Sequence, residues 1–514
     1  MSLINISNLT FAYSTLTSAA KLRKNNKPHK RRRYESSPEN IFENVSFAID
    51  TDWKLGFIGR NGRGKTTFLK LLLGQYAYRG QINASVDFAY FPYTVRDRNQ
   101  TALAAAAEIY PDYELWRLEK ELSLLNLDTA VLTRTFSALS GGEQAKIMLA
   151  VLFLKENNFL LIDEPTNHLD LEAREIVAQY LNRKKGFILV SHDRHFLDSC
   201  IDHVLAINRA NLEVQRGNFS SWQQNKTAQD NFELAENAKL KKDIRHLQEA
   251  SRRLAGWSDK TERGKYHIDK GSGAAYDKGF IGHKAAKMMR LAKNAERRQK
   301  TAITAKAQLL KNIETAEDLK LRPLVFHQNP LIEMNDLSIA YADKPIFTKL
   351  NFTLSAGERI HLQGRNGCGK SSLLKLILGE KIQHTGELKV PSGLKISYIP
   401  QDTTQMRGGL KDYAEQYQLE ESLFKAILRK LDFSREQFEK NLQDFSGGQK
   451  KKVLLARSLC ESAHLYIWDE PLNFIDVLSR IQIENLILQY QPTLLFVEHD
   501  KVFAEKTATR TVEL

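Results

Sequence analysis

The same order of short apolar runs occurs at two distant places in the chain. Lys54–Ile58 and Arg359–Gln363 have the character of strands, and after a glycine-rich passage each is followed by a helical leucine run, Phe68–Leu73 or Leu373–Leu378. Asn158–Ile162 is a continuous apolar run, which is typical of a parallel strand buried on both faces. The pattern predicts an α/β protein in which strand, loop and helix succeed one another twice.

The region between the two halves has helical periodicity. One arm is predicted from about Asn225 to Trp257 and another from about His283 to Leu319, because apolar residues recur there at intervals of three or four. At 1.5 Å per residue, each arm would extend roughly 50 Å. We therefore expect a helical hairpin linker, residues 225–325 with its tip at about 257–283, between a first domain, 1–224, and a second, 326–514.

Both strand-to-helix passages carry the motif G-x-x-x-x-G-K-[S/T], at Gly59–Thr66 and Gly364–Ser371. In this context the glycines turn successive backbone N–H groups towards a phosphate, the helix N-terminus adds a favourable dipole, and the lysine reaches the terminal phosphates. The hydroxyls of Thr66 and Ser371 are expected to coordinate Mg²⁺. A glycine turn before an ordinary helix could explain one copy, but the duplication indicates two ATP-binding domains.

The spacing of later motifs repeats as well. The loop lysine and the serine of a Ser-Gly-Gly motif are 75 residues apart in the first half (Ser140) and 76 in the second (Ser446). In both halves a further 23 residues lead to an Asp-Glu pair, which begins at Asp163 or Asp469. A histidine follows 29 residues after the first aspartate and 30 after the second. Repeats of this length are duplicated domains rather than units of a solenoid.

These motifs resemble the ATP-binding cassette (ABC) superfamily over roughly residues 1–224 and 330–514. The resemblance implies that Asp163 and Asp469 hold Mg²⁺, and that the next residue in each half is a base or orients water, since phosphoryl transfer needs a positioned nucleophile. An Asp-Glu pair could otherwise be a structural cap before Pro165 or Pro471. The predicted catalytic residues are Glu164, Glu470, His192 and His499.

The resemblance also implies that each Ser-Gly-Gly motif contacts ATP held by the other cassette, so that ATP joins the two halves. An aromatic residue is expected to stack on each adenine. The nucleotide contacts predicted in the first half are Tyr13, Gly59, Arg60, Asn61, Gly62, Arg63, Gly64, Lys65, Thr66, Thr67, Ser140, Gly141 and Gly142. Those predicted in the second half are Tyr341, Gly364, Arg365, Asn366, Gly367, Cys368, Gly369, Lys370, Ser371, Ser372, Gln401, Ser446, Gly447 and Gly448. The predicted Mg²⁺ ligands are Thr66, Asp163, Ser371, Gln401 and Asp469.

Two departures from the family pattern distinguish the halves. Gln401 occupies the place of the family's glutamine loop in the second cassette, whereas Tyr93 stands there in the first. After the catalytic pair, the first cassette has the usual Asn-His-Leu-Asp sequence, whereas the second has Phe474 in place of the histidine. We therefore expect two nonequivalent sites that both retain the hydrolytic glutamate.

The composition of the chain limits the kinds of binding partner that we expect for it. The chain has 514 residues and a net charge of +14, yet it has no apolar stretch of the roughly 18–20 residues that a transmembrane helix needs. Its start does not resemble a signal peptide, and three scattered cysteines fit a reducing cytoplasm. The positive charge is concentrated in 226–322, with 23 Lys and Arg against 13 Asp and Glu, and in 14–38, with eight against one. The remainder of the chain is not basic.

The composition of the linker favours RNA. Basic residues, glycines and aromatics are interleaved between Trp257 and Gly282, a combination suited to backbone phosphates and stacked bases. A solvated coiled-coil spacer is the alternative. The charge is confined to a protruding element, and we therefore favour the RNA-binding interpretation.

Two cassettes, no membrane span and a basic linker together resemble the ABC-F family of ribosome-associated ATPases. The passages Asn61–Lys65, Trp468–Asn473 and Val497–Asp500 resemble the Vga/Lsa type, which protects bacterial ribosomes from lincosamides, pleuromutilins and streptogramin A. The resemblance implies a cytoplasmic monomer whose ATP-closed form enters the E site of the 70S ribosome. Its linker would approach the P-site tRNA and the peptidyl-transferase centre of 23S rRNA, and hydrolysis would release it.

The first cassette carries 23 extra residues between its first two strands, and we interpret the insert 14–38 as a surface loop that could contact ribosomal RNA. Three alternatives to ribosome protection remain. The chain could be a housekeeping ABC-F translation factor, the ATPase component of a transporter with separate membrane subunits, or a DNA-repair ATPase. Co-purification of ribosomes, membrane proteins or DNA would separate these classes.

Overall fold

The computed structural model describes residues 2–13, 40–167, 169–207, 211–233, 319–341, 344–365 and 367–514, together with isolated helical positions between 235 and 301. The chain divides into two compact units, one formed by Met1–Ser220 with Ala316–Leu514 and the other by Ser221–Thr315. The insert 14–38, and the predicted linker tip apart from His283, lie outside the described residues. The described positions from 221 to 301 are helical. Within the described part of the chain, no helix combines the length and apolarity needed to cross a membrane.

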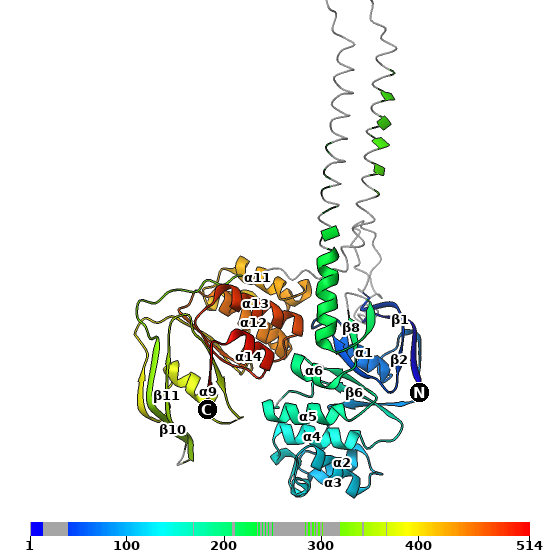
Figure 1. The fold of residues 1–514 in the computed structure, drawn as a ribbon, viewed down its shortest axis with the longest axis horizontal. Helices are drawn as coiled ribbons and strands as arrows, with labels where there is room; N and C mark the ends of the chain where they lie inside the picture. The colour runs from blue at the N-terminus through cyan, green and yellow to red at the C-terminus, as the bar shows by residue number, and fades with distance from the viewer. Residues whose placement is uncertain are drawn as a thin grey trace, which may run out of the picture. The chain divides into compact units, whose positions relative to one another are not determined.

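The first cassette contains an antiparallel sheet of order β2-β1-β4 and a larger sheet of order β5-β6-β7-β3-β8-β9, in which only the β8–β9 pair is antiparallel. Helices α2, α3 and α4 lie together, away from β1 and β2 (Figure 1). The elements are β1 Leu3–Phe11, β2 Phe42–Asp50, β3 Lys54–Ile58, α1 Lys65–Leu72, β4 Arg79–Asn83, β5 Asp87–Phe91, α2 Ala102–Ile109, α3 Leu115–Leu124, η1 Thr129–Thr133, η2 Phe136–Ala138, α4 Gly141–Leu152, β6 Asn158–Asp163, α5 Leu171–Asn182, β7 Phe187–Val190, α6 Arg194–Cys200, β8 His203–Ile207 and β9 Leu212–Arg216.

The second cassette repeats this plan, with sheets of order β11-β10-β13 and β14-β15-β16-β12-β17. All strand pairs of its larger sheet are parallel. Its elements are β10 Ile332–Tyr341, β11 Lys344–Leu354, β12 Arg359–Gln363, α9 Lys370–Ile377, β13 His384–Lys389, β14 Ile396–Ile399, α10 Leu410–Gln416, α11 Glu421–Lys430, η5 Arg435–Glu439, η6 Leu442–Asp444, α12 Gly447–Cys460, β15 Leu465–Asp469, α13 Val477–Tyr490, β16 Leu494–Val497, α14 Lys501–Thr507 and β17 Arg510–Glu513. The predicted α/β fold class, with two domains of the same plan, is confirmed.

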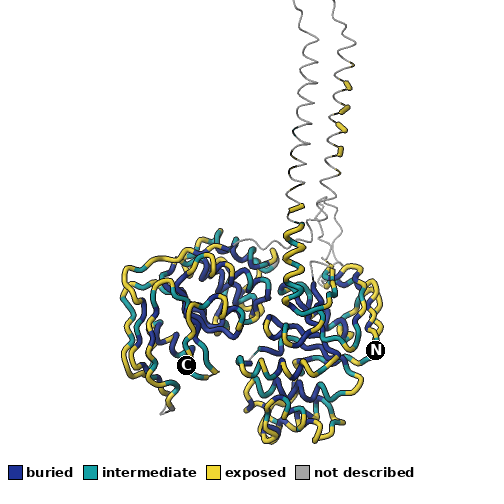
Figure 2. Tube along the Cα trace, in the orientation of Figure 1, coloured by how far each residue is buried: buried dark blue, intermediate teal, exposed yellow. Residues whose placement is uncertain are grey.

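The burial patterns explain why these sequences form these sheets. Strands β3, β6 and β7 are almost continuously buried, as expected of parallel strands covered on both faces, whereas β1 alternates buried and exposed positions. The buried positions form the interior of each cassette, and the exposed ones cover its outside (Figure 2). Because the strands of the larger sheets are parallel, their carboxyl ends meet at one edge, where α/β sheets bind ligands.

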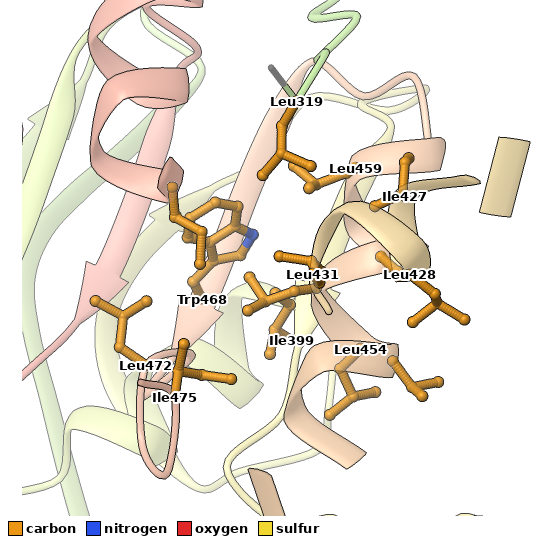
Figure 3. Packing of buried hydrophobic residues seen from close by; sticks show 14 of the residues in the cluster. Leu319, Ile399, Ile427, Leu428, Leu431, Leu454, Leu459, Trp468, Leu472 and Ile475 are labelled. Carbon is orange, nitrogen blue, oxygen red and sulfur yellow. The ribbon is translucent and has the colours of Figure 1, made fainter. Parts of the chain in front are cut away.

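The segment that follows the second unit is held in the core of the second cassette. Leu319 and Leu321 are buried in the same cluster as Trp468 of β15 and Leu459 of α12, as Figure 3 shows for Leu319, Leu459 and Trp468. The backbone N–H of Leu324 also donates to the carbonyl of Ala463, at 2.8 Å. We call Leu319–Leu324 the anchor segment. It packs against β15, the strand that ends at Asp469, the first residue of a predicted catalytic pair.

Candidate functional site: two composite nucleotide sites

Each glycine-rich loop precedes a helix that begins at its lysine, α1 at Lys65 and α9 at Lys370. Gly64 and Gly369 immediately before these helices have φ values of 99° and 98°, which L residues rarely adopt. A β-carbon at Gly64 would also lie 2.6 Å from the Ile41 side chain. The loop conformation thus requires glycine at these positions.

The loop lysines are held against their own loops. The Lys65 Nζ donates to the carbonyl of Gly59 at 2.6 Å, and the Lys370 Nζ donates to that of Gly364 at 2.7 Å. Burial lowers the pKa of Lys65, against the opposing charges of Asp476 and Glu164. A buried ammonium whose visible partners are mostly backbone carbonyls is suited to an anionic ligand such as a phosphate.

The Ser-Gly-Gly motifs cap two other helices. Ser140 and Ser446 are the N-caps of α4 and α12, and each forms a capping box with the residue three positions later, Glu143 or Gln449. This local chemistry fixes where both helices begin. The first residues of each of these helices line a pocket that is also lined by the glycine-rich loop of the other cassette.

Two pockets result, and each contains residues of both cassettes. Site 1, a cavity of about 400 Å³, is lined by Asn61, Gly62, Lys65, Thr66, Asp163, Glu164 and His192 from the first cassette and by Ser446, Gly447 and Gly448 from the second. Site 2, about 720 Å³, is lined by Gly367, Gly369, Lys370, Ser371, Ser372, Gln401, Glu470 and His499 from the second cassette and by Ser140 and Gly141 from the first. The structure thus brings together residues that are several hundred positions apart in the sequence.

Several predicted residues lie beside these pockets rather than in their walls. The Tyr13 ring is half exposed and its hydroxyl is 2.8 Å from the Thr67 hydroxyl. Asp469 lies in a neighbouring cavity that also contains Ser371 and Gln401. Asn366 and the side chain of Tyr341 lie outside the described residues. The remaining predicted contacts, which are absent from the linings of sites 1 and 2, are Gly59, Arg60, Arg63, Gly64, Thr67, Gly142, Gly364, Arg365 and Cys368.

The catalytic pairs follow directly from the strands β6 and β15. Glu164 and Glu470 have φ values of 52° and 49°, a left-handed conformation that is unusual for glutamate and that often marks functional sites. Their backbone N–H groups donate to the carbonyls of Val190 and Val497, at 2.9 and 3.0 Å, so the turn is fixed by the adjacent strand. The backbone therefore turns each glutamate towards the pocket immediately after the aspartate.

The surroundings of the two glutamates differ. Burial and the neighbouring Asp163 raise the pKa of Glu164 to about 8, against the opposing charge of Lys65. Burial also favours a raised pKa for Glu470. Hydrogen bonds with His499 and Gln401 outweigh this effect, so the pKa of Glu470 is lowered. The nonequivalence predicted from the sequence therefore has a counterpart in the hydrogen bonds of the two sites.

The histidines after β7 and β16 face these glutamates. The His192 Nε2 is 3.2 Å from the Glu164 Oε1, and the His499 Nε2 is 3.4 Å from the Glu470 Oε1. Burial and the charges of Lys65 and Arg480 hold the pKa of His192 well below its usual range, which favours a neutral imidazole.

The oxygen atoms beside the phosphate loops fit Mg²⁺. One oxygen of Asp163 accepts from the Thr66 hydroxyl at 3.0 Å, and Asp469 forms a hydrogen bond with Ser371. The Oδ1 of Asp469 is buried without a hydrogen-bond partner among the described atoms. Mg²⁺ prefers such oxygen ligands and usually completes its shell with water and phosphate. Among the described residues, no group of three or more His, Cys, Asp or Glu side chains could hold a metal ion.

The structure adds contacts between the cassettes that the sequence did not indicate. Arg60 lies 3.3 Å from Asp432, and the Asn61 side chain donates to the carbonyl of Phe474 at 2.7 Å. Near site 2, Arg174 of the first cassette donates to the carbonyl of His499 of the second cassette, at 3.0 Å. Arg60, Asn61 and His499 belong to motifs identified in the sequence, and Phe474 departs from the family pattern, but Asp432 and Arg174 gave no signal in the sequence.

Comparison with known proteins agrees with this geometry. The ABC transporter family model matches residues 42–167 and 347–473. The ribosome protection protein VmlR of Bacillus subtilis (strain 168) is 30% identical over 491 residues, which cover 92% of this chain and 84% of that protein. This chain belongs to the ABC-F family of ATPases. The ATP-binding protein Uup of Buchnera aphidicola subsp. Acyrthosiphon pisum (strain APS) is 27% identical, over 99% of this ABC-F chain and 80% of its own length.

Solved structures agree on the fold. The archaeal ribosome recycling factor aABCE1, crystallised with the ribosomal stalk protein aP1, superposes on this ABC-F ATPase with a TM-score of 0.59 at 18% identity, covering 91% of this chain and 85% of that chain. The family model and the relatives VmlR and Uup confirm the predicted family and the predicted ATP hydrolase activity. The roles of individual site residues remain predictions.

Proposed function

We propose that this ABC-F ATPase is a cytoplasmic ribosome protection protein. With ATP in both sites its cassettes close, and the closed form binds the E site of the bacterial 70S ribosome. The linker then approaches the P-site tRNA and 23S rRNA and displaces antibiotics of the lincosamide, pleuromutilin and streptogramin A classes. ATP hydrolysis releases the protein.

The composite construction of sites 1 and 2 is the observation that carries the proposal. Each pocket joins the phosphate loop of one cassette to the Ser-Gly-Gly motif of the other, so a nucleotide that contacts both walls favours the closed form through differential affinity. The similarity to VmlR, whose name describes ribosome protection, and the basic linker sequence support the ribosome as the partner.

In each site the chain's own residues have distinct proposed tasks. The loop lysine binds the phosphates, the Ser-Gly-Gly helix contacts them from the opposite cassette, and Glu164 or Glu470 orients the attacking water and accepts its proton. The nearby histidine contacts the terminal phosphate. Thr66 with Asp163, and Ser371 with Asp469 and Gln401, would hold Mg²⁺, which neutralises developing charge on the phosphates.

The proposal is tested by replacing both glutamates, as E164Q/E470Q. This variant keeps the size of both side chains and removes the base, so ATP binds but is not hydrolysed, and the protein is expected to sediment with 70S ribosomes. A matched control is E114Q/E387Q, which changes two exposed glutamates outside the pockets. If the E164Q/E470Q variant sediments free of ribosomes in the presence of ATP, the proposed mechanism is wrong.

A housekeeping role in translation is the second candidate. The identity to the ATP-binding protein Uup, 27% over nearly the whole chain, is close to the 30% identity to VmlR. Expression of the wild-type protein in a drug-sensitive bacterium separates the two. Protection predicts a raised inhibitory concentration for the three drug classes, whereas unchanged inhibitory concentrations together with trapping of E164Q/E470Q on ribosomes would favour the housekeeping role.

A further inference from the structure

The two cassettes differ in how they hold the aspartate at the end of the catalytic strand. In the first cassette, the Tyr90 hydroxyl donates to the Oδ2 of Asp163 at 2.9 Å. Thr66 donates to the same oxygen at 3.0 Å. One carboxylate oxygen is thus engaged twice, and the plane of the carboxylate is fixed.

The strand register explains why Tyr90 reaches this oxygen. Strands β5 and β6 are parallel neighbours, and Tyr90 is paired with Leu161. Side chains alternate along a strand, so Leu161 and Asp163 share a face, and Tyr90 lies on that face one step before the aspartate. A phenolic hydroxyl is protonated at neutral pH, so Tyr90 is the donor in this hydrogen bond.

The equivalent tyrosine of the second cassette is Tyr398. Tyr398 is paired with Ile467 in the same register, two positions before Asp469. Among the described contacts its hydroxyl has no bond to Asp469. The backbone carbonyl of Tyr398 accepts a hydrogen bond from the Arg457 guanidinium of α12. The corresponding position of α4 is Val151, which cannot make this bond.

The loops that follow these strands differ in a complementary way. Gln401 lines site 2 and forms a hydrogen bond with Glu470. Tyr93, which occupies the equivalent position in the first cassette, is half buried and is not among the residues that line site 1. Site 1 therefore lacks the side chain that orders the acidic pair in site 2.

We propose that Tyr90 is a positioning residue of site 1, whose hydroxyl holds one oxygen of Asp163 and leaves the other free to bind Mg²⁺ with ATP. It compensates in site 1 for the missing glutamine. The inference rests on the proposed role of Asp163 as a Mg²⁺ ligand. Tyr90 is not among the residues that line site 1.

The test uses Mn²⁺ as a paramagnetic probe of the Mg²⁺ sites. The E164Q/E470Q protein is saturated with ATP, and free Mn²⁺ is measured by electron paramagnetic resonance during a titration. Three substitutions are added separately to this background: Y90F, Y398F and D163N. Tyr90→Phe removes only a hydroxyl and retains the ring, and Tyr398→Phe makes the same change at the equivalent position of the second cassette.

A lost charge-assisted hydrogen bond is expected to weaken one of the two Mn²⁺ sites about tenfold in Y90F. The other site, the melting temperature and the binding of ATP in EDTA should not change. Y398F should retain both affinities, and D163N should lose one site. A purely structural role of Tyr90 would lower the melting temperature without this selective loss of Mn²⁺ affinity.

The outcomes separate the inference from the assignment on which it rests. If D163N loses one Mn²⁺ site but Y90F binds Mn²⁺ like the parent protein, Tyr90 does not position Asp163. Equal weakening in Y90F and Y398F would overturn the proposed difference between the cassettes. If D163N retains both sites, the assignment of Asp163 as a Mg²⁺ ligand is itself wrong.

Discussion

Arg194 and Glu484 form a buried ion pair between the cassettes, and its removal is expected to weaken closure. The Arg194 Nη2 lies 2.8 Å from the Glu484 Oε2, and the two side chains are only 4% and 3% exposed. In an open form, water would solvate both groups. The substitution R194M removes the charge and retains an apolar side chain, so its cost falls on the closed form.

The free-energy cost of R194M for closure depends on the charged groups that remain near Glu484. Removal of one partner from a buried ion pair costs about 3–5 kcal/mol. Lys506 stays 2.7 Å from Glu484, which lowers the penalty for the carboxylate left behind, so we expect a loss of about 3 kcal/mol. Since every 1.4 kcal/mol is a tenfold change, the closing equilibrium should fall roughly 100-fold.

The assay measures closure directly. Donor and acceptor dyes on α3 and α11 report the approach of the cassettes during an ATP titration of the E164Q/E470Q protein, and R194M should shift the midpoint to higher ATP. The matched control is K501M, because Lys501 is the first residue of α14 as Arg194 is of α6, and its partner Glu175 lies on α5, the helix that corresponds to α13. That pair is 3.7 Å long and about half exposed, so its removal should cost less than about 1 kcal/mol.

A double-mutant cycle completes the test. Replacing both partners, as R194M/E484M, leaves no uncompensated buried charge and should recover part of the loss. The reasoning is refuted if R194M closes at the same ATP concentration as the parent protein, or if K501M shifts the midpoint equally.

Two further predictions concern stability. Leu319→Ala leaves a cavity in the core of the second cassette and should lower the free energy of unfolding by about 2–5 kcal/mol, measured by heat or urea. As the control, Val325→Ala at a 91% exposed position should change it by less than about 0.5 kcal/mol. Equal effects of the two substitutions would show that Leu319 does not stabilise this core. Burial opposes ionisation of Asp476, but Lys452 and the Ser479 N–H outweigh it and hold the pKa of Asp476 far below its ordinary value. Its ionised form therefore adds stability above about pH 4, the pKa of an unfolded aspartate, and loses it below. Asp476→Asn should destabilise the protein at pH 7, and the deficit in urea unfolding should shrink from pH 5 to pH 3; a deficit independent of pH would refute this.

Much of the fold could be predicted because its signals are local. The apolar runs at Lys54–Ile58 and Arg359–Gln363 form β3 and β12 with the predicted bounds, since five consecutive residues suffice to define a strand that is buried on both faces. The Ser-Gly-Gly motifs carry their own capping residues, so the starts of α4 and α12 are also encoded within a few positions.

The site was only partly predictable. Repeated motifs identified the loops and the acidic pairs, but the partners Asp432 and Arg174 have no motif that distinguishes them from other charged residues. Their contacts with Arg60 and the His499 carbonyl arise because separate elements meet at an interface. Tyr90 and Tyr398 are likewise equivalent in sequence, and only the tertiary structure shows that the Tyr90 hydroxyl bonds to an aspartate.

The sequence by itself therefore determined the two cassettes, their phosphate loops and their expected asymmetry, because backbone geometry and short motifs depend on nearby residues. Only the tertiary structure decided which oxygen of Asp163 accepts from Tyr90, how His499 and Gln401 lower the pKa of Glu470, and that Arg194 is buried against Glu484. These properties depend on distance and on exclusion of water, and packing sets both between residues far apart in the chain.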